Sequence, residues 1–214
     1  MEVDAILSGV EKTADAIREQ LDVLDTVREK AYKLSREIVR ASSITIKHMH
    51  RNEVDEARGQ LGATAALVAE MQEALADASQ LSRGGFVADA EKEYVEAAIV
   101  IACMAGDEVP DHATLGVCGA VWLNGLAEVV GELRRHVLDL IRMGEPERAE
   151  GFLAAMEDIH QIIMSFDYPD AITLGLRRRS DAARGMVERT RGDLTNALRQ
   201  ASLEKRLGQL EERL

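Results

Sequence analysis

The sequence is poor in aromatic residues and in proline. Of its 214 residues only 3% are aromatic and three are proline, whereas 46% are hydrophobic, mostly Ala, Leu, Val and Ile. Aliphatic side chains of this kind suit closely packed helices. No stretch alternates β-branched and polar residues around an Asn-Gly or Asp-Gly turn, so nothing indicates a β-hairpin. These features predict an all-α fold, and the length predicts a single domain over residues 1–214.

Cysteines and long apolar runs are also scarce. The two cysteines, Cys103 and Cys118, both lie in apolar surroundings, and we expect two buried free thiols, as is usual in a reducing cytosol. The most apolar run, 97–105, is far too short to cross a bilayer. The N-terminal segment is acidic and lacks the charged-then-apolar pattern of a signal peptide. We therefore expect a cytoplasmic protein without membrane contact.

Positive charge is the minority charge, with 26 Lys and Arg against 38 acids and a net charge of -12. This balance argues against a general nucleic-acid-binding protein, because phosphate contacts need clustered cations. The cations are nevertheless concentrated in two segments, 28–51 and 177–191. In the first, five of them return to one helical face and form what we call the basic stripe: Lys33, Arg36, Arg40, Lys47 and Arg51. The stripe could hold a phosphate backbone, or it could simply solvate a helix or pair with acids of a neighbour.

The spacing of the apolar residues predicts a bundle of six to seven helices. The first is long, either straight or slightly bent, and Pro146 suits the first turn of the fifth. The charged end of the last helix is expected to fray. The expected helices cover about 3–51, 53–82, 86–105, 113–143, 146–166 and 170–207.

Two pairs of acids stand on consecutive predicted helices. Glu93 and Glu96 are spaced i,i+3, and Glu128 and Glu132 are spaced i,i+4, so each pair lies on one helical face. Both pairs adjoin strongly apolar stretches, and a carboxylate near a buried stretch needs a partner. A hard divalent cation suits an oxygen-only cluster. The same spacings occur on many solvated helices, so spacing alone leaves a metal site and a solvated face both open.

Several stretches together resemble the translin family, in particular its translin-associated factor X (TRAX) branch. The stretches are Lys33-Leu-Ser-Arg-Glu-Ile38 with His50-Arg51, Glu93-Tyr-Val-Glu-Ala97, and Gly131-Glu-Leu-Arg134 preceded by Glu128. The segment from Phe152 to Leu198 follows the family layout more loosely, so the resemblance covers nearly the whole chain. No single motif is specific, but their order and spacing together are.

The resemblance implies an all-helical protomer that assembles into a hollow octamer and binds RNA or single-stranded nucleic acid on its inner surface. In the TRAX branch it also implies a divalent-metal-dependent endoribonuclease. The catalytic acids of that branch fall on Glu93, Glu96 and Glu128, with Glu132 beside them. Glu128 stands where the family has aspartate, which moves this carboxylate out by one methylene. The resemblance is to a prokaryotic, single-subunit form, so we expect a homo-oligomer. A hetero-oligomer with a translin-like subunit is the alternative.

The resemblance and the residues together predict hydrolysis of single-stranded RNA by a metal-activated water. Mg²⁺ or Mn²⁺ held by Glu93, Glu96 and Glu128 would orient and acidify a water, and Glu132 would complete the shell. The basic stripe would hold the RNA backbone. Two alternatives stay open. One is an all-α nucleoside-triphosphate pyrophosphohydrolase, which needs no basic stripe; the other is a non-catalytic translin-like oligomer that binds RNA or single-stranded DNA.

Overall fold

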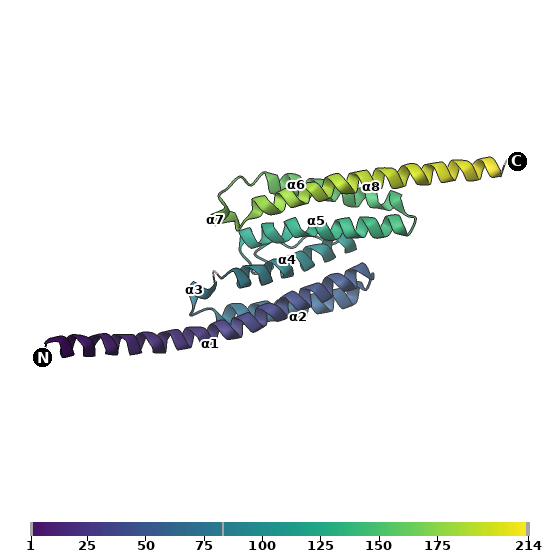
Figure 1. Ribbon diagram of the computed structural model, residues 1–214. Helices are drawn as coiled ribbons and strands as arrows, with labels where there is room; N and C mark the ends of the chain where they lie inside the picture. The colour runs from purple at the N-terminus through teal and green to yellow at the C-terminus, as the bar shows by residue number, and fades with distance from the viewer. Residues whose placement is uncertain (1, 83, 213–214) are drawn as a thin grey trace.

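The computed structural model describes residues 2–82 and 84–212, with the side chains of residues 2–6 excepted, and this part of the chain contains helices and no strand (Figure 1). The predicted all-α fold is therefore confirmed. The helical elements are α1 (Glu2–His50), α2 (Val54–Ala74), α3 (Ser79–Ser82), α4 (Gly85–Ala105), α5 (Gly119–Arg142), the 3-10 turn η1 (Pro146–Ala149), α6 (Glu150–Met164), α7 (Asp170–Thr173) and α8 (Leu176–Glu211). The sequence predicts the limits of α1 and α4 to within two residues.

Three predicted boundaries are wrong. The second helix ends at Ala74 instead of Ser82, and the single turn of α3 follows it. The fourth begins at Gly119, six residues later than expected. The segment before it is a loop, in which Asp111 Oδ1 accepts a hydrogen bond from the Thr114 amide at 2.7 Å.

The third wrong boundary lies in the last helix, which is interrupted by two left-handed residues. Leu174 has φ 55° and Gly175 has φ 81°, and they separate the single turn of α7 from the long α8. Glycine adopts such a backbone readily, but leucine does so rarely. Within the described residues α8 continues to Glu211.

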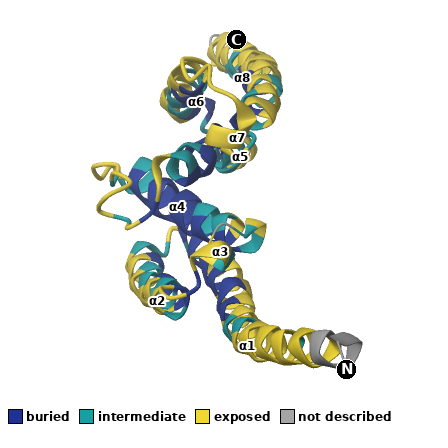
Figure 2. Cartoon of the chain, turned by 90° about the vertical axis from the view of Figure 1, so that its left-hand side faces the viewer, coloured by how far each residue is buried: buried dark blue, intermediate teal, exposed yellow. Residues whose placement is uncertain are grey.

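The core centres on α4, which lies between α1 and α2 on one side and α5 on the other, and α6 and α8 pack on the far side of α5 (Figures 1 and 2). Every residue from Tyr94 to Ala102 is buried, including Glu96. Large aliphatic side chains such as Ile99 are fully buried, and each contributes roughly 1.5–3 kcal/mol to folding. An acid placed within this run is therefore held at a fixed position by the packing around it.

The two longest helices reach beyond the bundle at opposite ends (Figure 1). The N-terminal part of α1 carries a row of apolar residues at helical spacing, and several are half exposed or more: Leu7, Val10, Ile17 and Leu21. The C-terminal part of α8 exposes Leu203, Leu207 and Leu210 in the same way. Among the described residues, no helix is both long enough and apolar enough to cross a membrane.

Both cysteines are free, as expected, but only Cys103 is partly buried. Cys118 is exposed, so the expectation of two buried thiols is wrong for this residue. The cause is the late start of α5: Cys118 is its N-cap and ends the preceding loop instead of packing within a helix.

Candidate acidic site between α4 and α5

The structure brings the four predicted acids together between two helices. Glu93 and Glu96 lie on α4, and Glu128 and Glu132 lie on α5. The helices approach closely because Gly125 faces α4: a Cβ at this position would lie 2.5 Å from Val95 Cγ1. Only glycine allows that approach, and it places the acidic face of α4 beside that of α5. We call these four residues the acidic site.

Glu96 carries the most strongly perturbed carboxyl of the acidic site. Its residue is only 8% exposed. Burial first, and then the negative charges of the three other carboxylates, raise the pKa of Glu96 to about 8, with Lys92 opposing. No hydrogen bond from a described residue is among the influences on this pKa. Glu96 is therefore mostly protonated at neutral pH, and its ionised form would need a further cation close by.

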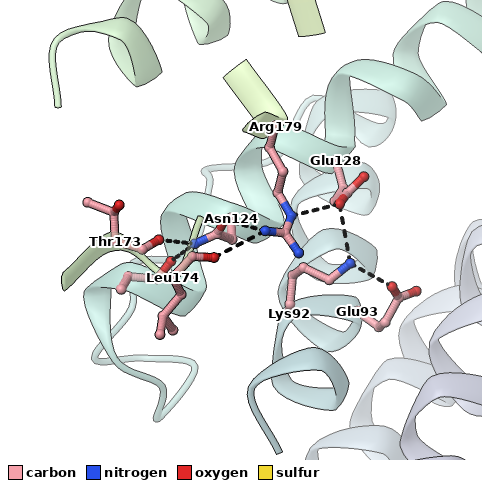
Figure 3. Close-up of polar contacts among 8 residues, drawn as sticks. Lys92, Glu93, Asn124, Glu128, Thr173, Leu174 and Arg179 are labelled. Carbon is pink, nitrogen blue, oxygen red and sulfur yellow. Dashed lines mark hydrogen bonds and ion pairs between the residues drawn. The ribbon is translucent and has the colours of Figure 1, made fainter. Parts of the chain in front are cut away.

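Lys92, on the same helix as Glu96, bridges the carboxylates of Glu93 on α4 and Glu128 on α5 (Figure 3). Lys92 Nζ lies 2.9 Å from Glu93 Oε1 and 3.3 Å from Glu128 Oε1, and the lysine side chain is 11% exposed. Burial lowers the pKa of Lys92, but the hydrogen bonds and charges of Glu93 and Glu128 outweigh it, so the pKa is raised. Lys92 is thus a charged ammonium that links α4 to α5.

Arg179 contacts Glu128 from α8 and is itself fixed by neutral groups. Its Nε donates to Glu128 Oε1 at 3.0 Å, and its Nη1 donates to Asn124 Oδ1 at 2.9 Å and to the Leu174 carbonyl at 3.3 Å (Figure 3). Asn124 Nδ2 donates in turn to the Thr173 carbonyl at 2.7 Å. The left-handed turn between α7 and α8 is what presents these carbonyls to α5 and Arg179.

The fourth carboxylate is held by a histidine at the end of α1. His50 Nε2 lies 2.5 Å from Glu132 Oε2, and the histidine side chain is 5% exposed. The hydrogen bond from His50 is the main cause that lowers the pKa of Glu132, against the opposing effect of burial. The other ring nitrogen, His50 Nδ1, is buried and has no hydrogen-bond partner among the described residues.

Four carboxylates are the donor set that Mg²⁺ and Mn²⁺ prefer, so the chemistry of the acidic site fits such an ion. The raised pKa of Glu96 fits it as well, because a nearby dication would favour the ionised form of this carboxyl. Within the described residues, however, no three His, Cys, Asp or Glu side chains converge as ligands of one metal. The reason is visible in the contacts: Lys92, Arg179 and His50 direct three of the four carboxylates toward themselves.

Sequence reasoning missed Lys92, Arg179 and Asn124. Lys92 stands directly before Glu93, and Arg179 belongs to the arginine-rich segment 177–191, so the sequence placed both near features that it does indicate. The pairing itself depends on which helices pack together, which neither position reveals. Beside Glu128, Arg178 and Arg179 line a cavity of about 300 Å³ between α5 and α8.

All five residues of the basic stripe are exposed, four of them on α1 and Arg51 directly after its end. None of them makes an ion pair with a described residue, so pairing with a neighbour's acids does not explain the stripe within the described chain. Arg36, Arg40 and Lys47 line an open groove of about 520 Å³ together with Phe86 and Asp89. A larger cavity, of about 720 Å³, lies between α6 and the start of α8 and contains none of the predicted site residues.

No protein-family model matches the chain. It is 30% identical over 189 residues to the uncharacterized protein MJ0175 of Methanocaldococcus jannaschii, covering 87% of this chain and 83% of that protein. Its structure is similar to AfC3PO at 32% identity, with TM-scores of 0.74 for AfC3PO and 0.73 for the AfC3PO–duplex RNA complex. Apo-NeC3PO, at 19% identity and a TM-score of 0.77, has the same fold. Each of these structures covers 86% of this chain, and 96% of the C3PO chain is matched.

Proposed function

The chain belongs to the translin family, to which the C3PO proteins belong, and from this we propose that it is a metal-dependent endoribonuclease of the TRAX type that cleaves single-stranded RNA or single-stranded regions of RNA. The complex of AfC3PO with duplex RNA supports RNA as the ligand. The observation that carries the catalytic part is the gathering of four carboxylates between α4 and α5.

In this proposal Glu93, Glu96 and Glu128 hold Mg²⁺ or Mn²⁺, and Glu132 completes the shell. When bound, such an ion supplies an acidified water and offsets the charge that develops on the phosphate. Glu132 is kept ionised and in place by His50. The guanidinium groups of Arg178 and Arg179 line the cavity beside Glu128, where they are suited to contact a phosphodiester, because a guanidinium matches phosphate oxygens in pairs.

The basic stripe binds the RNA backbone in the same proposal. Its cations contact phosphates and not bases, so binding is tolerant of sequence and sensitive to salt. The stripe and the acidic site are connected through α1, which carries the stripe and ends at His50 against Glu132. RNA held along α1 is thereby directed toward α5.

We also propose that the protein acts as a homo-oligomer, an octamer by resemblance to the family, with pairing to a translin-like subunit as the alternative. The row of exposed apolar residues on the free part of α1 supports self-assembly, because apolar residues at this spacing are the usual seam between helices of neighbouring protomers. The oligomer mass by light scattering tests this directly, and a monodisperse monomer at micromolar concentration would contradict it.

The catalytic proposal is tested by replacing Glu93 and Glu96 together with Gln. We expect no cleavage of labelled single-stranded RNA in Mn²⁺ and RNA binding equal to that of the unaltered protein. The matched control is Glu70→Gln plus Glu73→Gln, an exposed acid pair with the same i,i+3 spacing on α2. Undiminished cleavage by the Glu93/Glu96 variant would end the catalytic claim.

One observation favours a second candidate, a non-catalytic RNA- or single-stranded-DNA-binding oligomer. Three of the four carboxylates already have cationic or imidazole partners in the chain, as structural acids would. The same assay separates the candidates: this one predicts binding without cleavage, whether Mn²⁺ or EDTA is present. Nucleoside triphosphates included in the reaction also test the pyrophosphohydrolase alternative, which predicts pyrophosphate release from them.

A further inference from the structure

The ammonium group of Lys92 occupies the space between a carboxylate of α4 and a carboxylate of α5 (Figure 3). It is within hydrogen-bonding distance of both, at 2.9 Å from Glu93 Oε1 and 3.3 Å from Glu128 Oε1. A Mg²⁺ or Mn²⁺ ion shared by these two oxygens would lie about 2.0–2.2 Å from each. Such an ion would therefore need the position that the ammonium holds, and two cations cannot share it.

Lys92 and Arg179 differ in how firmly they are held. Arg179 donates to Asn124 and to the Leu174 carbonyl as well as to Glu128, and three fixed bonds leave its planar guanidinium one orientation. Among the described residues Lys92 is bonded only to the two carboxylates, and its four-carbon stem is flexible. Arg179 also does not contact Glu93. Lys92 is therefore the cation that can give way while Glu128 stays in place.

The attraction between Lys92 and its two partners is stronger than that of a surface ion pair. The lysine side chain is 11% exposed, and charges shielded from water interact through a lower effective dielectric. Displacing the ammonium thus opposes binding of any ion at Glu93 and Glu128.

We infer that Lys92 is a built-in competitor of the metal ion: it holds Glu93 and Glu128 together in the metal-free protein, must leave them when a divalent ion binds, and so lowers the affinity for that ion. This inference deepens the proposed function, because it concerns the same carboxylates. It makes Lys92 a positioning residue for the acids and assigns it no contact with RNA.

The test is the affinity of the full-length protein for Mn²⁺, measured without RNA by titration calorimetry and by the electron paramagnetic resonance of free Mn²⁺. Lys92→Met keeps the apolar stem and removes the charge. We expect the dissociation constant for Mn²⁺ to fall roughly tenfold or more, and the gain to vanish when Glu93→Gln is added. Lys92→Arg, which keeps the charge, should stay close to the unaltered protein.

Lys30→Met is the matched control, because this lysine pairs with Glu70 at 3.2 Å on the exposed surface, away from the acidic site. Its Mn²⁺ affinity should not change. An unchanged or weaker affinity in Lys92→Met overturns the inference. Should this variant fail to fold by circular dichroism, Lys92→Gln is measured against the same criterion.

The outcome is separable from that of the proposed function. If the unaltered protein cleaves RNA but Lys92→Met binds Mn²⁺ no more tightly, the inference fails and the proposed function stands. If Lys92→Met gains affinity at Glu93 but no protein cleaves RNA, the function fails and the inference stands. If neither the unaltered protein nor Lys92→Met binds Mn²⁺, both are overturned.

Discussion

His136 lies on α5 one turn beyond Glu132, with its ring packed edge-on against Phe152 at a centroid distance of 4.5 Å. Burial first, and then the nearby charge of His50, lower the pKa of His136. The unfolded chain therefore takes up a proton at this residue more readily than the folded protein does. As pH falls through about 6.5, the free energy of unfolding should decrease because of this difference.

His136→Phe keeps the ring packing and removes the titrating group. We expect the variant to lose less unfolding free energy than the unaltered protein between pH 7.5 and pH 5.5, measured by urea unfolding in EDTA. His112→Phe, at an exposed loop position, is the control and should lose as much as the unaltered protein. Equal losses in all three proteins would show that His136 does not contribute.

Single residues also show how far the sequence can predict the acidic site. The facing of Glu93 with Glu96, and of Glu128 with Glu132, follows from helical spacing alone, because it is local geometry. Whether the two acidic faces lie against each other depends on how α4 packs on α5, which helical spacing alone does not determine. The partners Lys92 and Arg179 could not be predicted, since each reaches across to another helix from a position with no periodic signal.

At the scale of the elements, the spacing of α4 and α5 depends on Gly125. A Cβ there would lie 2.5 Å from Val95 Cγ1, 2.7 Å from Val95 Cβ and 3.0 Å from the Lys92 carbonyl oxygen. The last two are parts of the helix that cannot rotate away. Gly125→Ala should therefore push the helices apart, lower stability by about 1–3 kcal/mol and weaken Mn²⁺ binding at the acidic site.

The matched control for this prediction is Gly131→Ala on the same helix. A Cβ at Gly131 would meet only the flexible Met186 side chain at 3.6 Å, an ordinary contact, and alanine favours helix over glycine by roughly 0.5–1 kcal/mol. Urea unfolding and Mn²⁺ titration of both variants give the comparison. If Gly125→Ala behaves like Gly131→Ala, close packing at Gly125 does not set the site.

The ends of a helix could be predicted where glycine or proline in the sequence stops it. They could not be predicted where contacts with other helices stop it. Gly84, Gly85 and Gly106 bound α4, and the spacing placed that helix correctly. The end of α2 has neither glycine nor proline, so no residue near it predicts where the helix stops. The break at Leu174 is stabilised by hydrogen bonds that Arg179 donates to the Leu174 carbonyl and Asn124 donates to the Thr173 carbonyl. No local sequence pattern predicts these contacts.

At the scale of the molecule, the net charge and the local distribution of charge have opposite effects on a polyanion. The chain has a net charge of -12, yet the cations of the basic stripe, which make no ion pair with a described residue, lie along α1 and at its C-terminal end. A polyanion approaching most of the surface is repelled, while one approaching the stripe is attracted. In the proposed function this field favours the approach of RNA along the stripe, and it makes the affinity depend strongly on ionic strength.

This dependence gives a test of the basic stripe. Arg36→Gln plus Arg40→Gln removes two of its cations, so binding of single-stranded RNA should weaken, and the slope of log K against log salt should fall by roughly 1–1.4, or about 0.7 for each lost phosphate contact. Fluorescence anisotropy between low and physiological salt measures both quantities.

The control for the stripe is Arg18→Gln plus Arg28→Gln, which removes the same charge from the same helix. These two arginines already pair with acids of α1, Arg18 with Asp15 and Arg28 with Asp25 and Glu29, so they release few counterions when RNA binds. We expect the control to change the salt slope by much less than the stripe variant does. If both variants change it equally, net charge and not the stripe governs RNA binding, and α1 would lose its assigned role in directing RNA toward the acidic site.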